Sequence, residues 1–369
     1  MKIKDTIVLA ALVLLTLTPP WTFNLTCDMN SLVWLWGILL AGFSMFYICT
    51  YSKINLWAKG FLLWAFVLCF LSKAPYISFT MYWSLIAGAI YYVLCTQVED
   101  REPFYKAIQA IFFLVVLLLV MQLFGKDTLL NFNMKTPCIL GTIGNRMIFG
   151  SFVMCMAPFL LRNSWLNLIP LWLMAFASQS SGPVLSVACG TMVFAWHRFK
   201  KERVAISLAC VGILIVLAAT QNEVQTLTTF GRGPVWKRTV ELSVKNPLGY
   251  GGSTYKLLFP LYSQDLDSTK GAGEWEYDNT RGKGLAWRRA HNAVAQILFE
   301  YGFPGLVLAI GFFLTLLWRS RKDISMLSGL VMVAANMITA FPERSTNMVL
   351  LLLTALAFCE RKDDAIRSL

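Results

Sequence analysis

The chain has 369 residues, of which 57% are hydrophobic and only 14% are charged, and its mean hydropathy is +0.60. One soluble core cannot hide so much apolar surface, so the composition excludes an ordinary soluble domain and predicts a polytopic membrane protein. The formal net charge is +12. This excess needs no nucleic-acid partner, because the basic residues follow the pattern expected of membrane topology.

Apolar runs close to the roughly 20 residues that cross a bilayer recur along the chain. We therefore predict an all-α protein with about twelve transmembrane helices that contact membrane lipids. The runs lie near residues 6–20, 31–50, 57–72, 76–96, 107–124, 139–161, 165–178, 183–196, 204–219, 292–318, 324–341 and 347–359. The first run ends at Pro19-Pro20-Trp21 without a small-residue cleavage site, which indicates a retained signal anchor.

The positions of the basic residues predict the orientation of these spans. Lys2 and Lys4 precede the first run and place the N-terminus in the cytoplasm. Alternating the spans from there puts most of the 32 Lys and Arg residues on the cytoplasmic side and few in the short outer loops. Both termini are then cytoplasmic, and one long segment, residues 220–290, is an outer loop.

This long loop mixes charged residues with aromatic ones, which argues against disorder. Within it, Pro234 suits a first helical turn and Asn246-Pro247 a stop, while Trp236, Val240 and Val244 recur every four residues. The pattern predicts an amphipathic helix on the membrane surface. The alternative is a helix that only caps the bundle, since amphipathicity reports burial rather than chemistry.

Cysteines and carboxylates give no metal signal. Cys27 and Cys138 are the cysteines that fall in outer loops, and whether they pair stays open. Asp265-Leu266-Asp267 has the D-x-D spelling of metal-binding nucleotide-sugar transferases, but it lies on the wrong side of the membrane for nucleotide sugars. We predict no metal and no cofactor.

The junction between the long loop and the next span is the strongest candidate site. His291, one of only two histidines, is followed by Asn292, Gln296 and Glu300, whose spacing keeps them near one helix face. Polar residues inside a membrane are costly and therefore indicate function. The other interpretation of Gln296 and Glu300 is a polar seam that hydrogen-bonds a neighbouring span.

Three segments together resemble the O-antigen ligase and polymerase superfamily of bacterial envelope glycosyltransferases. They are Gly144-Asn145-Arg146-Met147-Ile148-Phe149-Gly150, the Gly-Arg…Trp…Asn-Pro-Leu-Gly-Tyr-Gly segment from Gly231 to Gly251, and His291-Asn292…Gln296…Glu300-Tyr301-Gly302. The resemblance covers residues 140–310, between N-terminal helices at 1–139 and C-terminal helices with a cytoplasmic tail at 311–369. It departs from the family at Ser180-Ser181-Gly182, where Ser-Arg-Gly is common.

The resemblance implies a GT-C-like, metal-independent enzyme of the bacterial inner membrane with its long loop in the periplasm. Such enzymes move a glycan from an undecaprenyl diphosphate carrier to an acceptor hydroxyl. The acceptor is the lipid A core in a ligase, a second lipid-linked glycan in a polymerase, and a pilin in related enzymes. We favour a ligase, because about twelve spans and a single large late loop fit that pattern.

The same resemblance assigns roles to residues. Arginine forks bind diphosphate oxygens bidentately and stay charged, so we expect Arg232 first, and then Arg146, Arg288 and Arg289, to hold the leaving group. His291 is the expected base, because imidazole can take a proton from a sugar hydroxyl near neutral pH. Asn292, Gln296 and Glu300 are expected to contact substrate.

A lipid-glycan flippase or another transporter is the alternative of a different class. Transporters commonly carry internal repeats and mid-membrane charges in both halves. This chain shows no such repeat, and its polar residues concentrate late, beside one outer loop.

Overall fold

The computed structural model describes residues 5–6, 8–10, 55–123, 146–178, 181–200, 233–263, 289–339 and 346–360. Within these ranges every regular element is a helix and no strand occurs, so the predicted all-α fold class is confirmed for this part of the chain. Most of the first predicted span, and those near 31–50 and 204–219, lie outside the described residues.

The helices follow the predicted apolar runs closely. In chain order they are α3 (Leu56–Leu71), α4 (Pro75–Thr96), α5 (Glu102–Leu123), α6 (Arg146–Asn163), the 3-10 turn η2 (Trp165–Asn167), α7 (Leu168–Ala177), α8 (Ser181–Arg198), α11 (Gly233–Lys245), α12 (Tyr255–Tyr262), α13 (Ala293–Ser320), α14 (Ile324–Thr339) and α15 (Thr346–Glu360). The predicted amphipathic loop helix is observed as α11, whereas the short α12 was not predicted.

Local signals in the sequence explain where several helices begin. The Asn55 side chain accepts a hydrogen bond from the backbone N–H of Trp57 at 2.9 Å and caps α3. Pro75 opens α4, where its missing N–H costs nothing. Asn292 caps α13 by accepting from the N–H of Ala295 at 3.0 Å.

Three of the described helices are long and apolar enough to cross a membrane: α4, the Glu102–Met121 part of α5, and α13. Shorter apolar helices are Leu56–Leu71, Trp165–Ala177, Ile324–Ile338 and Met348–Glu360. Large apolar side chains such as Leu63, Phe113 and Val307 are more than half exposed on the outside of the bundle. Such surfaces need a lipid environment. The total of about twelve spans stays a prediction.

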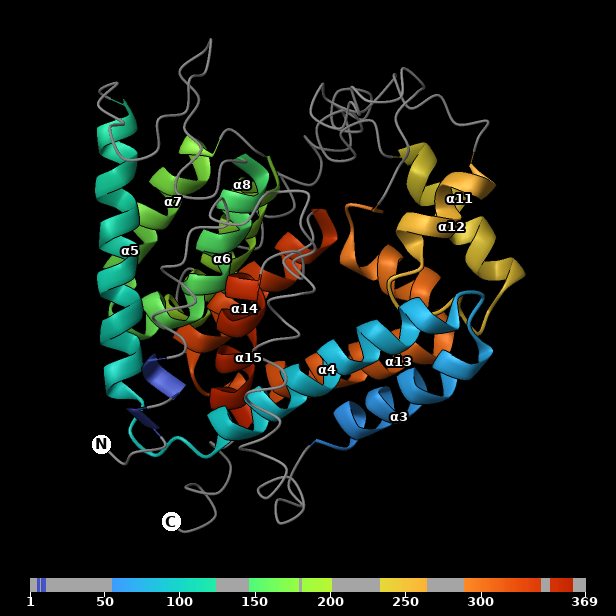
Figure 1. Ribbon diagram of the computed structural model, residues 1–369. Coiled ribbons are helices and arrows are strands. Elements are labelled where there is room, and N and C mark those ends of the chain that lie inside the picture. The colour runs from blue at the N-terminus through green and yellow to red at the C-terminus, as the bar shows by residue number, and fades with distance from the viewer. Residues whose placement is uncertain are drawn as a thin grey trace.

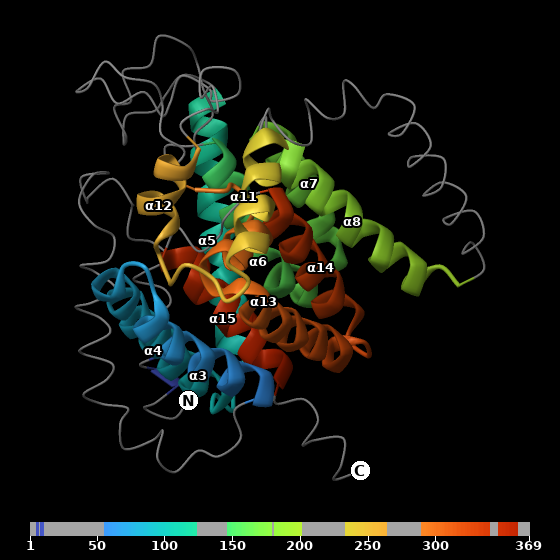
Figure 2. The same cartoon turned by 90° about the vertical axis from the view of Figure 1, so that its right-hand side faces the viewer.

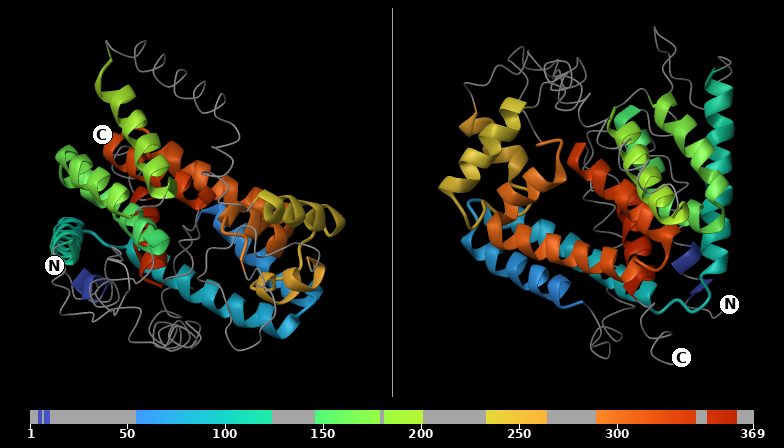
Figure 3. Two further views of the ribbon diagram at one scale, coloured as in Figure 1. Left: turned by 90° about the horizontal axis from the view of Figure 1, so that it is seen from above. Right: turned by 180° about the vertical axis from the view of Figure 1, so that it is seen from behind.

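The helices form two groups joined by α15 (Figures 1 and 3). In one group α14 packs against α6 and α8, with α5 and α7 outside them. In the other group α3 packs against α4 and α13, and α11 and α12 sit at the far end of α13. Helix α15 contacts both α4 and α6. The main apolar core lies in the first group and extends through α15, where Phe104, Phe159 and Phe358 are buried.

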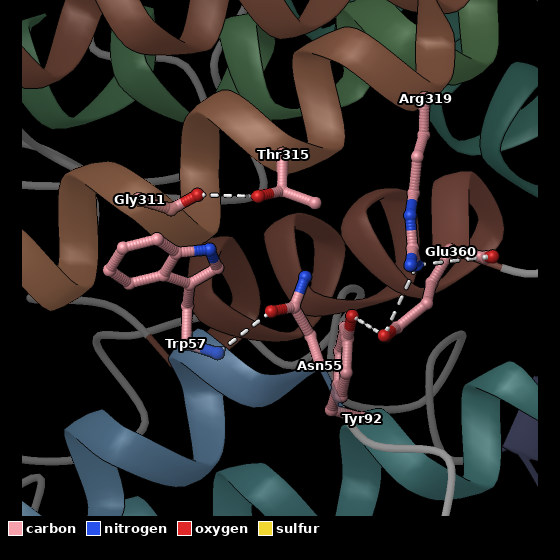
Figure 4. A network of polar contacts seen from close by, with 7 residues as sticks. All are labelled: Asn55, Trp57, Tyr92, Gly311, Thr315, Arg319 and Glu360. Atoms are coloured by element: carbon pink, nitrogen blue, oxygen red, sulfur yellow. Dashed lines mark hydrogen bonds and ion pairs between the residues drawn. The ribbon is translucent and has the colours of Figure 1, made fainter.

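A polar tie built around Glu360 joins four helices at one end of the molecule (Figure 4). The Tyr92 hydroxyl of α4 donates to the Glu360 carboxylate, and the Arg319 guanidinium of α13 lies 3.4 Å from it. Asn55, at the start of α3, lies in the same network. Nearby, the Arg101 guanidinium donates to the carbonyl of Phe358 at 2.7 Å.

The opposite ends of α3 and α4 carry a second polar cluster. The Ser72 hydroxyl lies 2.7 Å from that of Ser78 and 3.0 Å from the carbonyl oxygen of Tyr250, and the N–H of Lys73 donates to the same carbonyl at 3.2 Å. In this helix group Lys73, which the charge pattern assigns to the outer side, therefore lies at one end, and Arg319, which it assigns to the cytoplasmic side, lies at the other. The membrane topology itself stays a prediction.

Candidate functional site

The backbone is unusual where α13 begins. His291 is 5% exposed, and its φ of 53° places it in the left-handed region. Such a conformation is uncommon for a residue other than glycine, although histidine tolerates it better than most. Backbones of this kind persist only where the surrounding structure holds them, and they cluster at functional sites.

Helix α11 supplies one contact that holds this backbone. The indole N–H of Trp236 donates to the carbonyl oxygen of Ala290 at 2.7 Å. Ala290 directly precedes His291 and is itself fully buried. The first turn of α11 therefore lies against the residue before the histidine.

Helix α13 is broken at Gly302, ten residues after its cap Asn292. Gly302 has φ 66° and ψ −170°, a combination that is essentially restricted to glycine. Pro304 has no N–H to offer the Glu300 carbonyl, which lies four residues earlier. The break thus leaves two helix carbonyls, those of Phe299 and Glu300, without their normal helical donors.

The turn that follows α11 fills this break. The N–H of Tyr250 donates to the carbonyl of Phe299 at 3.0 Å, and the N–H of Gly251 donates to that of Glu300 at 2.9 Å. In return the N–H of Phe303 donates to the carbonyl of Pro247 at 2.9 Å. Two of the motif segments that carry the family resemblance are therefore joined by their backbones.

The glycines of both segments are required by this close approach. A Cβ at Gly302 would lie 2.3 Å from the carbonyl carbon of Leu248. A Cβ at Gly249, whose φ is 96°, would lie 2.5 Å from the backbone nitrogen of Gly302. Neither position can carry a side chain without displacing the other backbone.

Glu300 fixes the turn further along. Its buried carboxylate accepts hydrogen bonds from the backbone N–H of Ser253 at 2.9 Å and from that of Tyr255, in the first turn of α12, at 3.4 Å. The amide of Gln296 donates to the same carboxylate at 3.2 Å. The predicted common face of Gln296 and Glu300 is thus observed, and it points at the loop helices.

Aromatic packing completes the attachment of α11 and α12. Phe299 stacks on Tyr250 with ring centroids 4.4 Å apart and meets Tyr255 edge-on at 4.9 Å. Burial raises the pKa of Tyr255, so its hydroxyl stays protonated. Its oxygen lies 2.9 Å from the Thr239 hydroxyl, which donates its own proton to Val235, so Tyr255 donates to Thr239.

The predicted arginines are only partly described. Arg289 is half-buried two residues before His291, and it lies within electrostatic range of Glu300. Arg146 is the first residue of α6, but its side chain is outside the described part. Arg232 and Arg288 also lie outside it, each directly before a described segment. Asn292 is described, and its side chain serves as the cap of α13.

Several other residues discussed from the sequence lie outside the described part of the chain: the D-x-D motif Asp265-Leu266-Asp267, Cys27 and Cys138. Among the residues that are described, no group of three or more His, Cys, Asp or Glu side chains is placed to hold a metal ion.

Together, the fold and the site define an α-helical membrane protein with a buried histidine at the start of a broken helix. Residues 166–310 match a family model described as O-antigen ligase. This match supports membership of the O-antigen ligase and polymerase superfamily, whose members are glycosyltransferase-like enzymes. The match begins after the segment at 144–150, so that part of the resemblance lies outside it. No curated protein matches the chain.

Sequence reasoning missed two tryptophans that hold the site. Trp236 contacts the backbone before His291, and the indole N–H of Trp64, on α3, donates to the carbonyl of Tyr301 at 2.7 Å. Trp236 belongs to the motif segment from Gly231 to Gly251, and a tryptophan there could have indicated a buried indole N–H in need of an acceptor. Trp64 lies in an apolar run and carried no signal of its own.

Proposed function

We propose that this protein transfers a glycan from an undecaprenyl diphosphate carrier to an acceptor hydroxyl at the periplasmic face of the bacterial inner membrane. The acceptor we favour is the lipid A core, as in an O-antigen ligase. The family match over residues 166–310 supports the reaction class, and the packing of α11 against α13 supports the position of the site.

The chemistry assigns a role to each group. The acceptor oxygen attacks the anomeric carbon while the bond from that carbon to the diphosphate oxygen breaks. His291 takes the proton of the acceptor hydroxyl. Arg232, aided by Arg289, Arg288 and Arg146, offsets the charge that develops on the departing diphosphate, so that no metal is required.

One observation carries this proposal. The Trp236 to Ala290 hydrogen bond holds the first turn of α11 beside His291. Arg232 directly precedes Gly233, the first residue of α11, in the sequence. The segment that follows the proposed diphosphate ligand therefore meets the segment that carries the proposed base. The N-terminus of α13 adds a favourable pole for an anion.

Replacing each of the two histidines in turn tests the proposal. His291→Ala is expected to abolish transfer, with loss of surface glycan on a gel and accumulation of the carrier-linked donor on the outer leaflet. His197→Ala is the matched control, because His197 lies in the last turn of α8 and outside the proposed site. Normal glycan in cells that carry His291→Ala contradicts the assignment of the base.

The same experiment separates the alternatives. Loss of a ligase removes all carrier-derived glycan from the lipid A core, whereas loss of a polymerase leaves a single repeat attached. Donor trapped on the cytoplasmic leaflet indicates a flippase and contradicts an enzyme.

A further inference from the structure

Helix α11 leaves part of its apolar surface exposed. The stripe predicted from the sequence consists of Trp236, Val240 and Val244. Trp236 turns inward to Ala290, whereas Val240 is 46% and Val244 62% exposed, and Leu248 in the following turn is 47% exposed. The face that packs against the protein carries Val235, Thr239, Leu242 and Ser243, two of which are polar. These side chains form an exposed apolar surface that no described part of the protein covers.

Helix α13 carries a matching exposed stripe along its membrane-spanning part. Phe303, Val307, Ile310, Leu314 and Trp318 follow one another at spacings of three and four residues, and all are exposed. Since α13 is long and apolar enough to cross a bilayer, this stripe faces lipid.

The two stripes meet at the break in α13. The N–H of Phe303, the first residue of the α13 stripe, donates to the carbonyl of Pro247, which directly precedes Leu248. Figure 2 shows α11 next to α13 on the face that turns to the viewer. The exposed apolar surface thus continues from the spanning helix onto the loop helix.

The charged residues near the exposed apolar surface of α11 also favour contact with a lipid bilayer. Lys237 and Lys245 are exposed on α11, and Lys256 is exposed on α12. Basic residues beside an apolar stripe are typical of helices that lie in the interface of a bilayer, with lysines at the level of the lipid phosphates.

We propose that α11 docks on the outer leaflet of the bilayer, with Val240, Val244 and Leu248 among the acyl chains, as an extension of the lipid-facing stripe of α13. The side of the membrane rests on the proposed topology and function. The docking itself does not depend on the glycosyltransfer activity. Such an anchor fixes the depth at which the start of α11, and with it His291, meets a lipid-linked donor.

Fluorescence depth measurements test this proposal on the full chain in vesicles of phosphatidylethanolamine and phosphatidylglycerol. An environment-sensitive fluorescent amino acid is placed at Val244, with Lys245 as the matched control on the neighbouring face. Val307 of α13 serves as the reference for a lipid-facing position. Brominated acyl chains quench from the lipid side, and iodide quenches from the water side.

At Val244 we expect loss of fluorescence with brominated lipid, a blue-shifted emission and protection from iodide, as at Val307. At Lys245 we expect quenching by iodide. Quenching of Val244 by iodide alone overturns the proposal, and so does protection from both quenchers, which indicates a protein cover. A label at Val240 must agree with that at Val244. No glycan donor is present, so the outcome is independent of whether the proposed reaction is correct.

Discussion

A buried glutamate, Glu300, and a half-buried one, Glu360, hold opposite ends of the second helix group by different means. Glu300 accepts from the backbone N–H groups of Ser253 and Tyr255 and so binds a turn. Glu360 accepts from the side chain of Tyr92 and pairs with Arg319, and so ties helix to helix. The first arrangement depends on the path of the backbone, which only glycines permit here. The second depends on side chains that come from distant helices.

The difference bears on the proposed site. At the Glu300 end the break in α13 exchanges helical hydrogen bonds for bonds to the turn at 247–251. This exchange binds α11, α12 and the start of α13 into one unit that contains His291. At the Glu360 end the four helices simply meet, with no such break described in α13 after Gly302.

Among the substitutions at the Glu300 end, Gly302→Ala is expected to destabilise the protein most. The backbone conformation at this position costs roughly 1–3 kcal/mol for a residue with a Cβ, and the contact with Leu248 adds a steric term. We expect a clear fall in the thermal unfolding temperature in detergent and faster proteolysis within residues 247–263. Gly88→Ala is the control, since its Cβ would meet Leu353 at an ordinary 3.5 Å. Equal unfolding temperatures for the two variants contradict the account of the break.

Glu300→Ala is expected to have the next largest effect. It leaves the N–H groups of Ser253 and Tyr255 without their acceptor, at a cost of about 1–3 kcal/mol. Glu300→Gln keeps one acceptor oxygen and should lose less stability. Hydrogen exchange at residues 253–255 measures the effect locally, because the alanine variant should exchange faster there. The exposed Glu241→Ala is the control. If the glutamine variant is as unstable as the alanine variant, the carboxylate acts through its charge instead.

The Glu300 end could be anticipated from the sequence in large part. Most ends of the described helices lie within a few residues of the ends of the predicted apolar runs, and Pro234 and Asn246-Pro247 mark the two ends of α11. The glycines and polar residues of the two motifs marked the segments that meet. The backbone pairing of these segments could not be predicted, because every residue except proline carries the same backbone N–H, whatever its side chain.

The face of α11 shows a second limit. The sequence predicted an apolar stripe of Trp236, Val240 and Val244, yet Trp236 turns inward to Ala290 while Val240 and Val244 are exposed. Periodicity identifies an amphipathic face but does not say whether protein or lipid covers it. The polar residues Thr239 and Ser243 can face the protein because their hydroxyls donate to carbonyls of α11 itself.

The Glu360 end was not anticipated, because Tyr92, Arg319 and Glu360 lie more than two hundred residues apart at the extremes and share no motif.

A double-mutant cycle at the Glu360 end tests the same comparison, and its expected effect is the smallest. Tyr92→Phe removes one donor to a carboxylate, and Glu360→Gln removes its charge. Arg319 stays partly exposed, so its charge can still reach water and each single loss is moderate. The two changes share one network, so their effects on unfolding should be non-additive by about 0.5–3 kcal/mol. Tyr92→Phe combined with Glu300→Gln should be additive, because these residues lie at opposite ends. If the Tyr92 and Glu300 changes are as non-additive as the Tyr92 and Glu360 changes, the two ends of the helix group unfold together. That outcome contradicts the distinction between a bound turn at Glu300 and a contact between helices at Glu360.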